Sequence, residues 1–347
     1  MADRFPDDAS ASARPTLESV ARHAGVSRQT VSNVLHAPDR VSPDTAERVQ
    51  QAVAELGYRP VRAAQQLRTG RSRVLGLRID PQGGDGVSGA VLDRFLHALT
   101  ERAQADGYRV MLFAAEDDAG EIAAYDDLLG TLDIDGFLLT STHYGDVRTA
   151  WLRERGVPFV TFGRPWGAEE DHAWVDVDGA AGTSAAVAHL VAEGHERLGF
   201  LGWPAGSGVG DDRLRGWRAG LAAAGLTEGP VLAAYAEEER LRAAELLDEG
   251  EVTGVVCASD SLAVALRAAA EERGLVLGRD LAVVGFDDSS AASVLGLSSV
   301  AQPVREVAAE CVRLLRRAIE EGPRPSAADR VLLEPHLVPR ASSVKHD

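Results

Sequence analysis

The chain has 347 residues, more than one compact core usually holds, so we expect a small unit plus a larger domain, or three lobes. Hydrophobic residues make up 45% of the chain and charged residues 26%, as in ordinary folded proteins. No apolar run is long enough to span a membrane, and residues 1–15 do not have the pattern of a secretory signal. We therefore expect a cytoplasmic protein with a disordered tail over residues 1–14.

Charge is distributed unevenly along the chain. Residues 16–73 contain nine arginines and five acidic residues, a net charge of +4, whereas the whole chain carries −17. A basic segment in an otherwise acidic protein is typical of a nucleic-acid contact. Charge alone leaves open the alternative of a chance arginine cluster on a solvated face.

Two short helices are predicted at the start of this basic segment. Thr16 can cap a helix over residues 17–24, and Gly25 can end it because glycine tolerates positive φ. Ser27 can then cap a second helix over residues 28–36, so the two helices are joined by a short glycine-containing turn.

A third helix is predicted over residues 43–56. Ser42-Pro43 combines a capping serine with proline at the first helical position, and Gly57 closes the helix. Two helices joined by a tight turn and braced by a third form a helix-turn-helix, which we assign to residues 15–60.

The second helix carries residue types that read DNA. The N-terminal end of such a helix reaches base edges in the major groove. Arg28 suits guanine and Gln29 suits adenine, while Asn33 lies one turn further along the same face. Ser27, Thr30 and Ser32 suit phosphate contacts, with packing as the alternative for Thr30. The complete set of expected DNA-binding residues in the helical unit is Thr16, Ser27, Arg28, Gln29, Thr30, Ser32, Asn33 and Arg40.

The basic segment resembles the DNA-binding headpiece of the lactose-repressor (LacI/GalR) family of bacterial transcription regulators. The resemblance is carried by TLESVARHAGVSRQTVSNVL, VSPDTAERVQQAVAELGYRP and AAQQL, and it continues to the C-terminus. It implies a homodimer that binds a pseudo-palindromic operator and responds to a small-molecule effector. We expect a mono- or disaccharide that acts as an inducer.

Residues 61–72 match the hinge helix of that family. The segment is too short to be a stable isolated helix. The resemblance implies that it folds when two copies meet on the operator, where Leu67 enters the minor groove with Ala64 beside it. The family usually has asparagine where Val61 or Arg62 stands. A plain linker remains the alternative.

Short apolar runs alternate with helical stretches after residue 73, which predicts parallel α/β sheets. The scheme occurs twice, so we expect two doubly wound lobes, which by resemblance form the periplasmic-binding-protein type I fold. A helix over residues 304–319 should return the chain to the first lobe before it finishes in the second. The fold class is thus α/β with an all-α headpiece. The expected bounds are 73–173 and 303–330 for lobe 1, and 174–302 and 331–347 for lobe 2.

Polar and aromatic residues follow several of these strands, where doubly wound sheets bind ligands. By resemblance, Arg213 matches the arginine of an R-x-x-G pattern that binds sugar hydroxyls, and Asp287 matches the second sugar ligand. A carboxylate accepts two hydroxyl hydrogen bonds and a guanidinium donates a planar fork. The expected effector-binding residues are Arg164, Trp166, Trp203, Arg213, Ser259, Asp260, Phe286 and Asp287.

Some of these assignments have structural alternatives. Ser259 stands where the family has asparagine, and Asp260 could cap the following helix instead of touching a ligand. Trp203 and Phe286 could be core residues. The first lobe has no counterpart of the family's aromatic motif after its first strand, where the chain reads DPQGGDGVSG and Asp80 and Asp85 offer polar groups instead.

No pattern points to catalysis. Adjacent aspartates direct their carboxylates apart, the histidines lack metal-ligand spacing, and GGDGVSG is not a phosphate-binding loop. We expect no enzyme, no metal and no cofactor. Two other hypotheses remain beside a sugar-responsive repressor: a sugar-transport receptor, and a DNA-binding protein whose ligand domain has lost its ligand. We expect a dimer because the C-terminus has no leucine heptads.

Overall fold

The computed structural model describes residues 15–58, 70–80, 89–167, 171–235, 238–249, 252–323 and 326–344. The contacts divide the chain into two units, Met1–Ser72 and Arg73–Asp347. Three residues singled out in the sequence, Ala64, Leu67 and Asp85, lie outside the described residues, as does most of the expected hinge.

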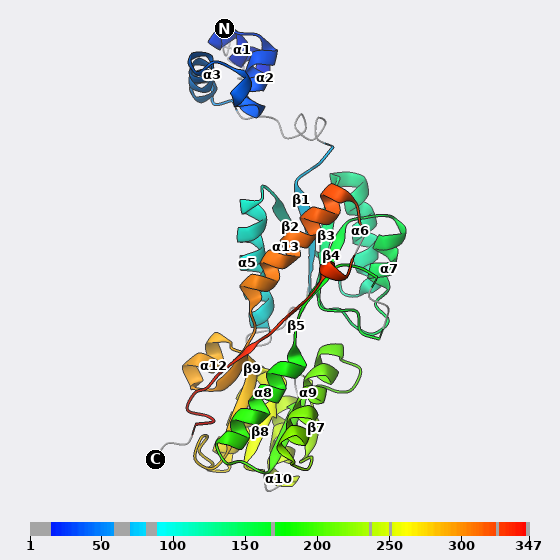
Figure 1. Ribbon diagram of the computed structural model, residues 1–347, viewed down its shortest axis with the longest axis vertical. Helices are drawn as coiled ribbons and strands as arrows, with labels where there is room; N and C mark the ends of the chain where they lie inside the picture. Colours follow the sequence, from blue (N-terminus) through cyan, green and yellow to red (C-terminus); the bar gives the residue numbers. More distant parts are fainter. Residues whose placement is uncertain are drawn as a thin grey trace, which may run out of the picture. The chain divides into compact units, whose positions relative to one another are not determined.

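In its described residues, 15–58 and 70–72, the first unit contains three α-helices, labelled in Figure 1, and a short 3-10 helix, η1. Their bounds are α1 Leu17–Ala24, α2 Arg28–His36, η1 Pro38–Arg40 and α3 Pro43–Leu56. Most predicted caps are present: Thr16 and Ser27 cap α1 and α2 through their side chains, Gly25 adopts φ 65° after α1, and Gly57 adopts φ 61° after α3. Ser42 precedes α3 as predicted, but its hydroxyl bonds to the Thr45 side chain and makes no cap hydrogen bond. The three helices enclose a small core that includes Val20, Val31 and Val49.

The first lobe of the second unit contains a six-stranded parallel sheet in the order β11-β5-β4-β3-β1-β2. Helices cover both faces of a parallel sheet, so its strands are apolar on both sides, as in the run GFLL of the third strand. The strands are β1 Val74–Ile79, β2 Arg109–Ala114, β3 Gly136–Leu139, β4 Phe159–Phe162, β5 Trp174–Val177 and β11 Arg330–Leu333. The helices are α5 Ala90–Ala105, α6 Asp118–Leu132, α7 Val147–Glu154 and α13 Val304–Glu321, of which α13 packs beside α5 (Figure 1).

The second lobe has a six-stranded sheet in the order β12-β10-β9-β8-β6-β7, in which β12 alone runs antiparallel to its neighbour. Its core includes Phe200, Trp217 and Phe286. The strands are β6 Leu198–Gly202, β7 Val231–Ala233, β8 Gly254–Cys257, β9 Ala282–Asp287, β10 Ser298–Ala301 and β12 His336–Val338. The helices are α8 Gly179–Ala192, α9 Gly208–Ala224, α10 Glu239–Glu249, α11 Asp260–Glu272 and α12 Ser290–Leu295. The 3-10 helix η4, Ala327–Asp329, lies between α13 and β11 of the first lobe.

The chain crosses between the two lobes at positions that differ from those predicted. The sequence pattern places residue 174 at the start of the second lobe, but β5 pairs with β4 and therefore belongs to the first sheet. The pattern also places residues 331–333 in the second lobe, whereas β11 pairs with β5. The prediction is wrong here because parallel strands buried on both faces look alike in sequence, and their sheet is decided by tertiary pairing. The return through α13 agrees with the prediction, and the helix ends at Glu321.

Within the described parts of the chain, no helix combines the length and the apolar character needed to cross a membrane.

Candidate nucleic-acid interface and interlobe pocket

The first turn of α2 faces solvent and is suited to an anion. The Ser27 hydroxyl caps the helix by accepting a hydrogen bond from the Thr30 backbone N–H at 3.0 Å. Arg28 and Gln29, which follow the cap, are exposed. The first turn contains no acidic residue, so the positive end of the helix dipole is not opposed by a carboxylate. This end of α2 can therefore approach a phosphate backbone.

Gln29 and Asn33 lie on one face of α2. Gln29 Nε2 donates a hydrogen bond to Asn33 Oδ1 at 3.0 Å, which places the two amides side by side. Thr30 and Ser32 are half-buried on the same helix. The helix thus presents a guanidinium and two amides, groups that read base edges in the major groove.

The other predicted DNA-binding residues have different placements. Thr16 is exposed and caps α1, where its hydroxyl accepts a hydrogen bond from the Ser19 backbone N–H at 3.2 Å. Arg40 is exposed at the end of η1. The predicted minor-groove pair, Ala64 and Leu67, lies outside the described residues.

A cavity of about 330 Å³ lies between the two lobes of the second unit. Its walls come from the ends of parallel strands and the loops that follow them, which is where doubly wound sheets bind ligands. Among its lining residues, the first lobe contributes Leu92, Thr142, Phe162, Trp166 and Asp176, and the second contributes Trp203, Asp212, Arg213, Ser259, Ser261 and Asp287. Gln302, on the crossover that leads into α13, also lines it.

Arg213 lies on α9 in the wall of this cavity and is only 5% exposed. Its guanidinium lies 3.7 Å from the Phe286 ring centroid and 5.4 Å from that of Trp203, so aromatic rings hold its plane. It donates a hydrogen bond to the Ala258 carbonyl, but its Nε has no hydrogen-bond partner among the described residues. Burial lowers the pKa of Arg213, and the charge of Asp287 opposes this effect.

Asp287 ends β9 and faces Arg213. Its Oδ1 accepts a hydrogen bond from Gln302 Nε2 at 2.7 Å and lies 3.7 Å from Arg213 Nη2. Burial raises the pKa of Asp287 to about 6, against the influence of Arg213. Its backbone adopts φ 110°, a conformation that is strained for a non-glycine residue. Arg94 of the first lobe donates hydrogen bonds to the carbonyl oxygens of Asp287 and Asp288 and so supports this strained turn.

Arg164 connects the two lobes on another side of the cavity. Its Nε lies 2.7 Å from Asp176 Oδ2 in the first lobe, and its Nη2 lies 3.2 Å from Asp212 Oδ2 in the second. Burial lowers the pKa of Arg164, but Asp176 and Asp212 raise it by more, so the pKa lies above its usual value. Burial also raises the pKa of Asp176, because Arg164 offsets only part of the desolvation. Arg164 is therefore engaged in an interlobe ion pair, and it does not line the cavity.

Asp260 and Phe286 have structural positions. Asp260 is fully buried and does not line the cavity; its carboxylate accepts hydrogen bonds from Ser299 Oγ at 2.6 Å and Ser289 N at 2.7 Å. Its expected alternative, capping α11, belongs instead to Ser259, whose hydroxyl accepts from Leu262 N at 3.3 Å. Phe286 lies in the core beneath Arg213. Trp166 and Trp203 both line the cavity.

Sequence reasoning missed several polar residues of the cavity, among them Asp176, Asp212 and Gln302. Asp176 had a signal, since an aspartate within the apolar run AWVDV is buried and needs a partner. Asp212 and Gln302 had none, because an acidic residue at the start of a helix and a glutamine after a strand are ordinary surface features.

The structure also gathers Asp118, His143 and Asp146 in the first lobe, with ligand atoms within 4.8 Å of one another. The spacing of the histidines did not indicate this cluster. Arg148, which is almost fully buried, lies 2.7 Å from Asp146 Oδ2 and 3.5 Å from Asp118 Oδ1. A guanidinium thus already neutralises these carboxylates, so the cluster is explained as an ion-pair network.

Comparison with known proteins agrees with both parts of the chain. Residues 16–61 match the family model of bacterial regulatory proteins, lacI family, and residues 187–343 match that of the periplasmic binding protein-like domain. The HTH-type transcriptional regulator CelR of Thermobifida fusca is 36% identical over 343 residues, which is 95% of this chain and 98% of that protein. The chain belongs to the lacI family of bacterial regulatory proteins.

Solved structures place this lacI-family chain among DNA-binding regulators. A lac repressor dimer bound to operator and the anti-inducer ONPF superimposes with a TM-score of 0.79 at 26% identity, covering 96% of this chain and all of that one. A complex of the transcriptional regulator CelR with cellobiose gives a TM-score of 0.69 at 32% identity, covering 95% of this chain and all of that one. The predicted family and fold class are confirmed, and the protein is a DNA-binding transcriptional regulator.

Proposed function

We propose that this regulator is a repressor that leaves its operator when a neutral mono- or disaccharide binds between its lobes. The observation that carries the proposal is the pairing of Arg213 with Asp287 in the wall of the interlobe cavity, 3.7 Å apart. A carboxylate beside a guanidinium offers acceptors and donors to adjacent hydroxyls, the arrangement that a sugar presents. Trp203 adds an aromatic surface for the apolar face of a ring.

The charges around the cavity favour an uncharged ligand. Three carboxylates line it, from Asp176, Asp212 and Asp287, whereas Arg213 is the arginine among its lining residues. Two further guanidinium groups nearby are also engaged: Arg164 pairs with Asp176 and Asp212, and Arg215 pairs with Asp212. A phosphate or carboxylate group would therefore add negative charge beside three carboxylates whose arginine partners are already engaged, in a partly desolvated site, which is unfavourable.

The proposed mechanism links this cavity to DNA through lobe closure. The lobes contact each other through Arg164 and Asp212 and through Arg94 at the Asp287 turn. A sugar that contacts both lobes prefers one lobe arrangement, and it shifts the population toward that arrangement. We infer that two chains pair, that their helix-turn-helix units read the two halves of a pseudo-palindrome, and that the sugar-bound arrangement disfavours this placement.

Other parts of the proposal follow from the family. A cytoplasmic regulator without enzymatic activity is expected, because lacI-family proteins act by binding DNA. The related CelR in complex with cellobiose supports a carbohydrate as the effector. Arg28, Gln29 and Asn33 are the proposed base-reading residues.

Thermal unfolding against a panel of ligands tests the effector class. The panel contains glucose, galactose, cellobiose, maltose, glucose 6-phosphate and a purine base. A ligand at 100 times its dissociation constant stabilises the folded protein by about 2.7 kcal/mol, which raises Tm by several degrees at about 2–4 °C per kcal/mol. We expect a shift with a neutral sugar and none with its phosphate. A Tm shift with the phosphate or the purine contradicts a neutral sugar as the effector. A panel in which no compound shifts Tm contradicts it as well.

A further inference from the structure

Glu239, at the start of α10, is a half-buried carboxylate without a cationic partner. Among the described residues it forms no ion pair, and the hydrogen bond that its side chain accepts comes from Ser261 Oγ at 3.3 Å. Taking a carboxylate out of water costs free energy unless other groups compensate. A carboxylate that no arginine balances, one hydrogen bond away from a residue of the interlobe cavity, therefore needs an explanation.

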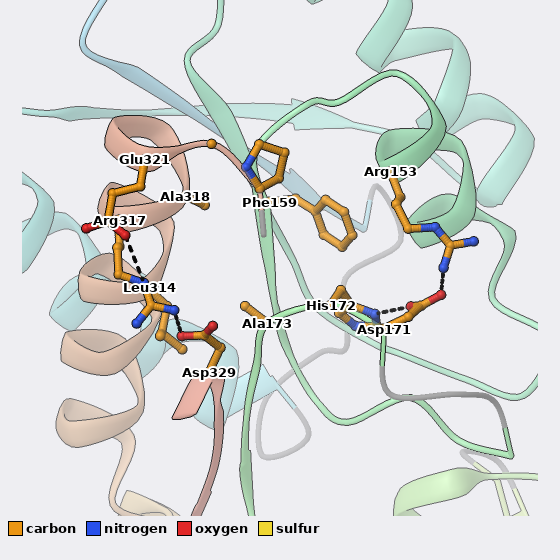
Figure 2. Close-up of a pocket in the computed structure, with 12 residues that line it drawn as sticks. Arg153, Phe159, Asp171, His172, Ala173, Leu314, Arg317, Ala318, Glu321 and Asp329 are labelled. Atoms are coloured by element: carbon orange, nitrogen blue, oxygen red, sulfur yellow. Dashed lines mark hydrogen bonds and ion pairs between the residues drawn. The ribbon is translucent and has the colours of Figure 1, made fainter. Parts of the chain in front are cut away.

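Another cavity of the protein shows how such charges are usually balanced. This cavity, of about 250 Å³, lies in the first lobe and is lined by parts of α13 and α7 (Figure 2). Arg317 pairs there with Asp329. Arg153 pairs with Asp171, so both carboxylates meet a guanidinium. Glu239 meets a hydroxyl group instead.

Hydrogen bonds form a continuous line from Glu239 to the wall of the interlobe cavity. Ser261 Oγ donates to Glu239 Oε1, and it also lies 2.8 Å from Ser259 Oγ. Ser259 Oγ accepts a further hydrogen bond from the Leu262 backbone N–H at 3.3 Å. Ser259 and Ser261 both line the cavity, and Glu239 lies behind them. The carboxylate can therefore act on the cavity only through the two serine hydroxyl groups.

The carboxylate fixes the direction of these hydrogen bonds. An ionised carboxylate can only accept, and a serine hydroxyl has a single proton to donate. Because Ser261 donates its proton to Glu239, the hydrogen bond between the two serines must use the proton of Ser259. Neither hydroxyl then has a proton left for the cavity. Burial raises the pKa of Glu239, but the hydrogen bond from Ser261 opposes this rise and favours the ionised form.

We propose that Glu239 is a positioning residue that keeps Ser259 and Ser261 as hydrogen-bond acceptors, so that the effector must place a donating hydroxyl group beside them. The inference rests on the proposed function, because it specifies how the sugar site reads one hydroxyl. A sugar hydroxyl can donate to these lone pairs. An ether oxygen, a fluorine or an anionic oxygen has no proton to donate and would leave them unsatisfied.

Fluorinated sugars test this direction, because fluorine replaces a hydroxyl group but has no proton to donate. Calorimetry of the full chain uses those of glucose, galactose, cellobiose and maltose that bind wild type, each with derivatives fluorinated at one hydroxyl position at a time. Fluorination at the position beside the serines should lower the affinity of wild type about 10- to 100-fold. Positions that other side chains read can lose affinity too, so the comparison with variants identifies the serine position.

Glu239→Leu releases the Ser261 proton, so the serines can donate to a fluorine. The loss caused by fluorination should then shrink by about 3-fold or more at one position and stay the same at every other position. Ser261→Ala interrupts the line at its middle and frees the Ser259 proton, so it should have the same position-specific effect, even if Glu239→Leu does not fold. Glu238→Leu changes the exposed neighbouring residue and should behave as wild type.

A merely structural role of Glu239 predicts a different result. Glu239→Leu would then lower the affinities for the parent sugar and for all its derivatives by one common factor. That result would overturn the inference, as would fluorination losses that are absent in wild type or the same in both variants as in wild type, and each would leave the proposed function standing. If wild type binds none of the four sugars, the proposed function fails and this inference fails with it.

Discussion

The Arg164 guanidinium of the first lobe lies 3.2 Å from the Asp212 carboxylate of the second lobe and 2.7 Å from Asp176 in its own lobe. One arginine thus neutralises two buried carboxylates on opposite sides of the interlobe cavity. Removing it leaves Asp176 without this ion-pair partner and leaves Asp212 paired with Arg215 alone, which is destabilising.

Arg164→Met should therefore destabilise the folded protein by about 3 kcal/mol. Urea unfolding, followed by a signal from the second unit, measures this loss in the free energy of unfolding. Adding Asp212→Asn removes a buried carboxylate that has lost its interlobe partner, so the double variant should be more stable than the sum of the two single changes predicts. Strict additivity of the two substitutions would show that the pair is not coupled.

Arg213→Lys should abolish the sugar response. Lysine keeps the charge but loses the planar fork that binds two oxygens, so sugar affinity should fall about 100-fold, or about 3 kcal/mol. Operator affinity without sugar should not change. Arg218→Lys on the same helix is the control, since Arg218 is 50% exposed, pairs with Glu228 and does not line the cavity. Retained sugar affinity in Arg213→Lys would remove this residue from the site.

Asp287 should make sugar binding depend on pH. Burial raises its pKa to about 6, and sugar hydroxyls donate to the ionised carboxylate. Sugar affinity should be constant above pH 7 and should fall as pH falls through 6. Near pH 6, sugar binding should release protons, which calorimetry in buffers of different ionisation enthalpy detects. Because the folded pKa exceeds the unfolded one, the unliganded protein gains stability from this group at low pH and loses it as pH rises through 6. Asp287→Asn should abolish that loss; the same pH profile in the variant would contradict the assignment.

Arg28 and Arg40 should differ in their effects on DNA binding. Arg28→Ala should relax discrimination at one base position and cost about 1–3 kcal/mol on the preferred site. Arg40→Ala should weaken binding to all sequences by a similar factor and reduce the salt dependence by about one phosphate contact. Binding to an operator and to its single-base variants over a range of salt concentrations separates the two. A uniform loss in Arg28→Ala would contradict base reading.

The local features of this protein could be predicted from its sequence. The helices of the first unit begin and end at Thr16, Gly25, Ser27 and Gly57 because caps act through neighbouring residues. Features that depend on tertiary pairing could not be predicted in the same way. The apolar run of β5 does not indicate which sheet it joins, and Asp212 acquires its role only when Arg164 of the other lobe reaches it.

The candidate cavity was predictable in part for the same reason. Arg213 and Asp287 matched a family pattern, and both line the cavity. Arg164, Asp260 and Phe286 were expected beside them, yet each has a structural partner instead: Arg164 pairs with two carboxylates, Asp260 anchors α12, and Phe286 supports Arg213. Position after a strand indicates that a residue lies near a site, and side-chain partners decide whether it faces the ligand.

The central claim is that sugar binding and operator binding oppose each other. The most direct measurement is fluorescence anisotropy of a labelled operator, selected from random duplexes, with and without a sugar that stabilises the protein. We predict that the sugar raises the Kd for the operator, and that the operator raises the Kd for the sugar by the same factor, as thermodynamic linkage requires. An operator affinity that no bound sugar alters would contradict the account.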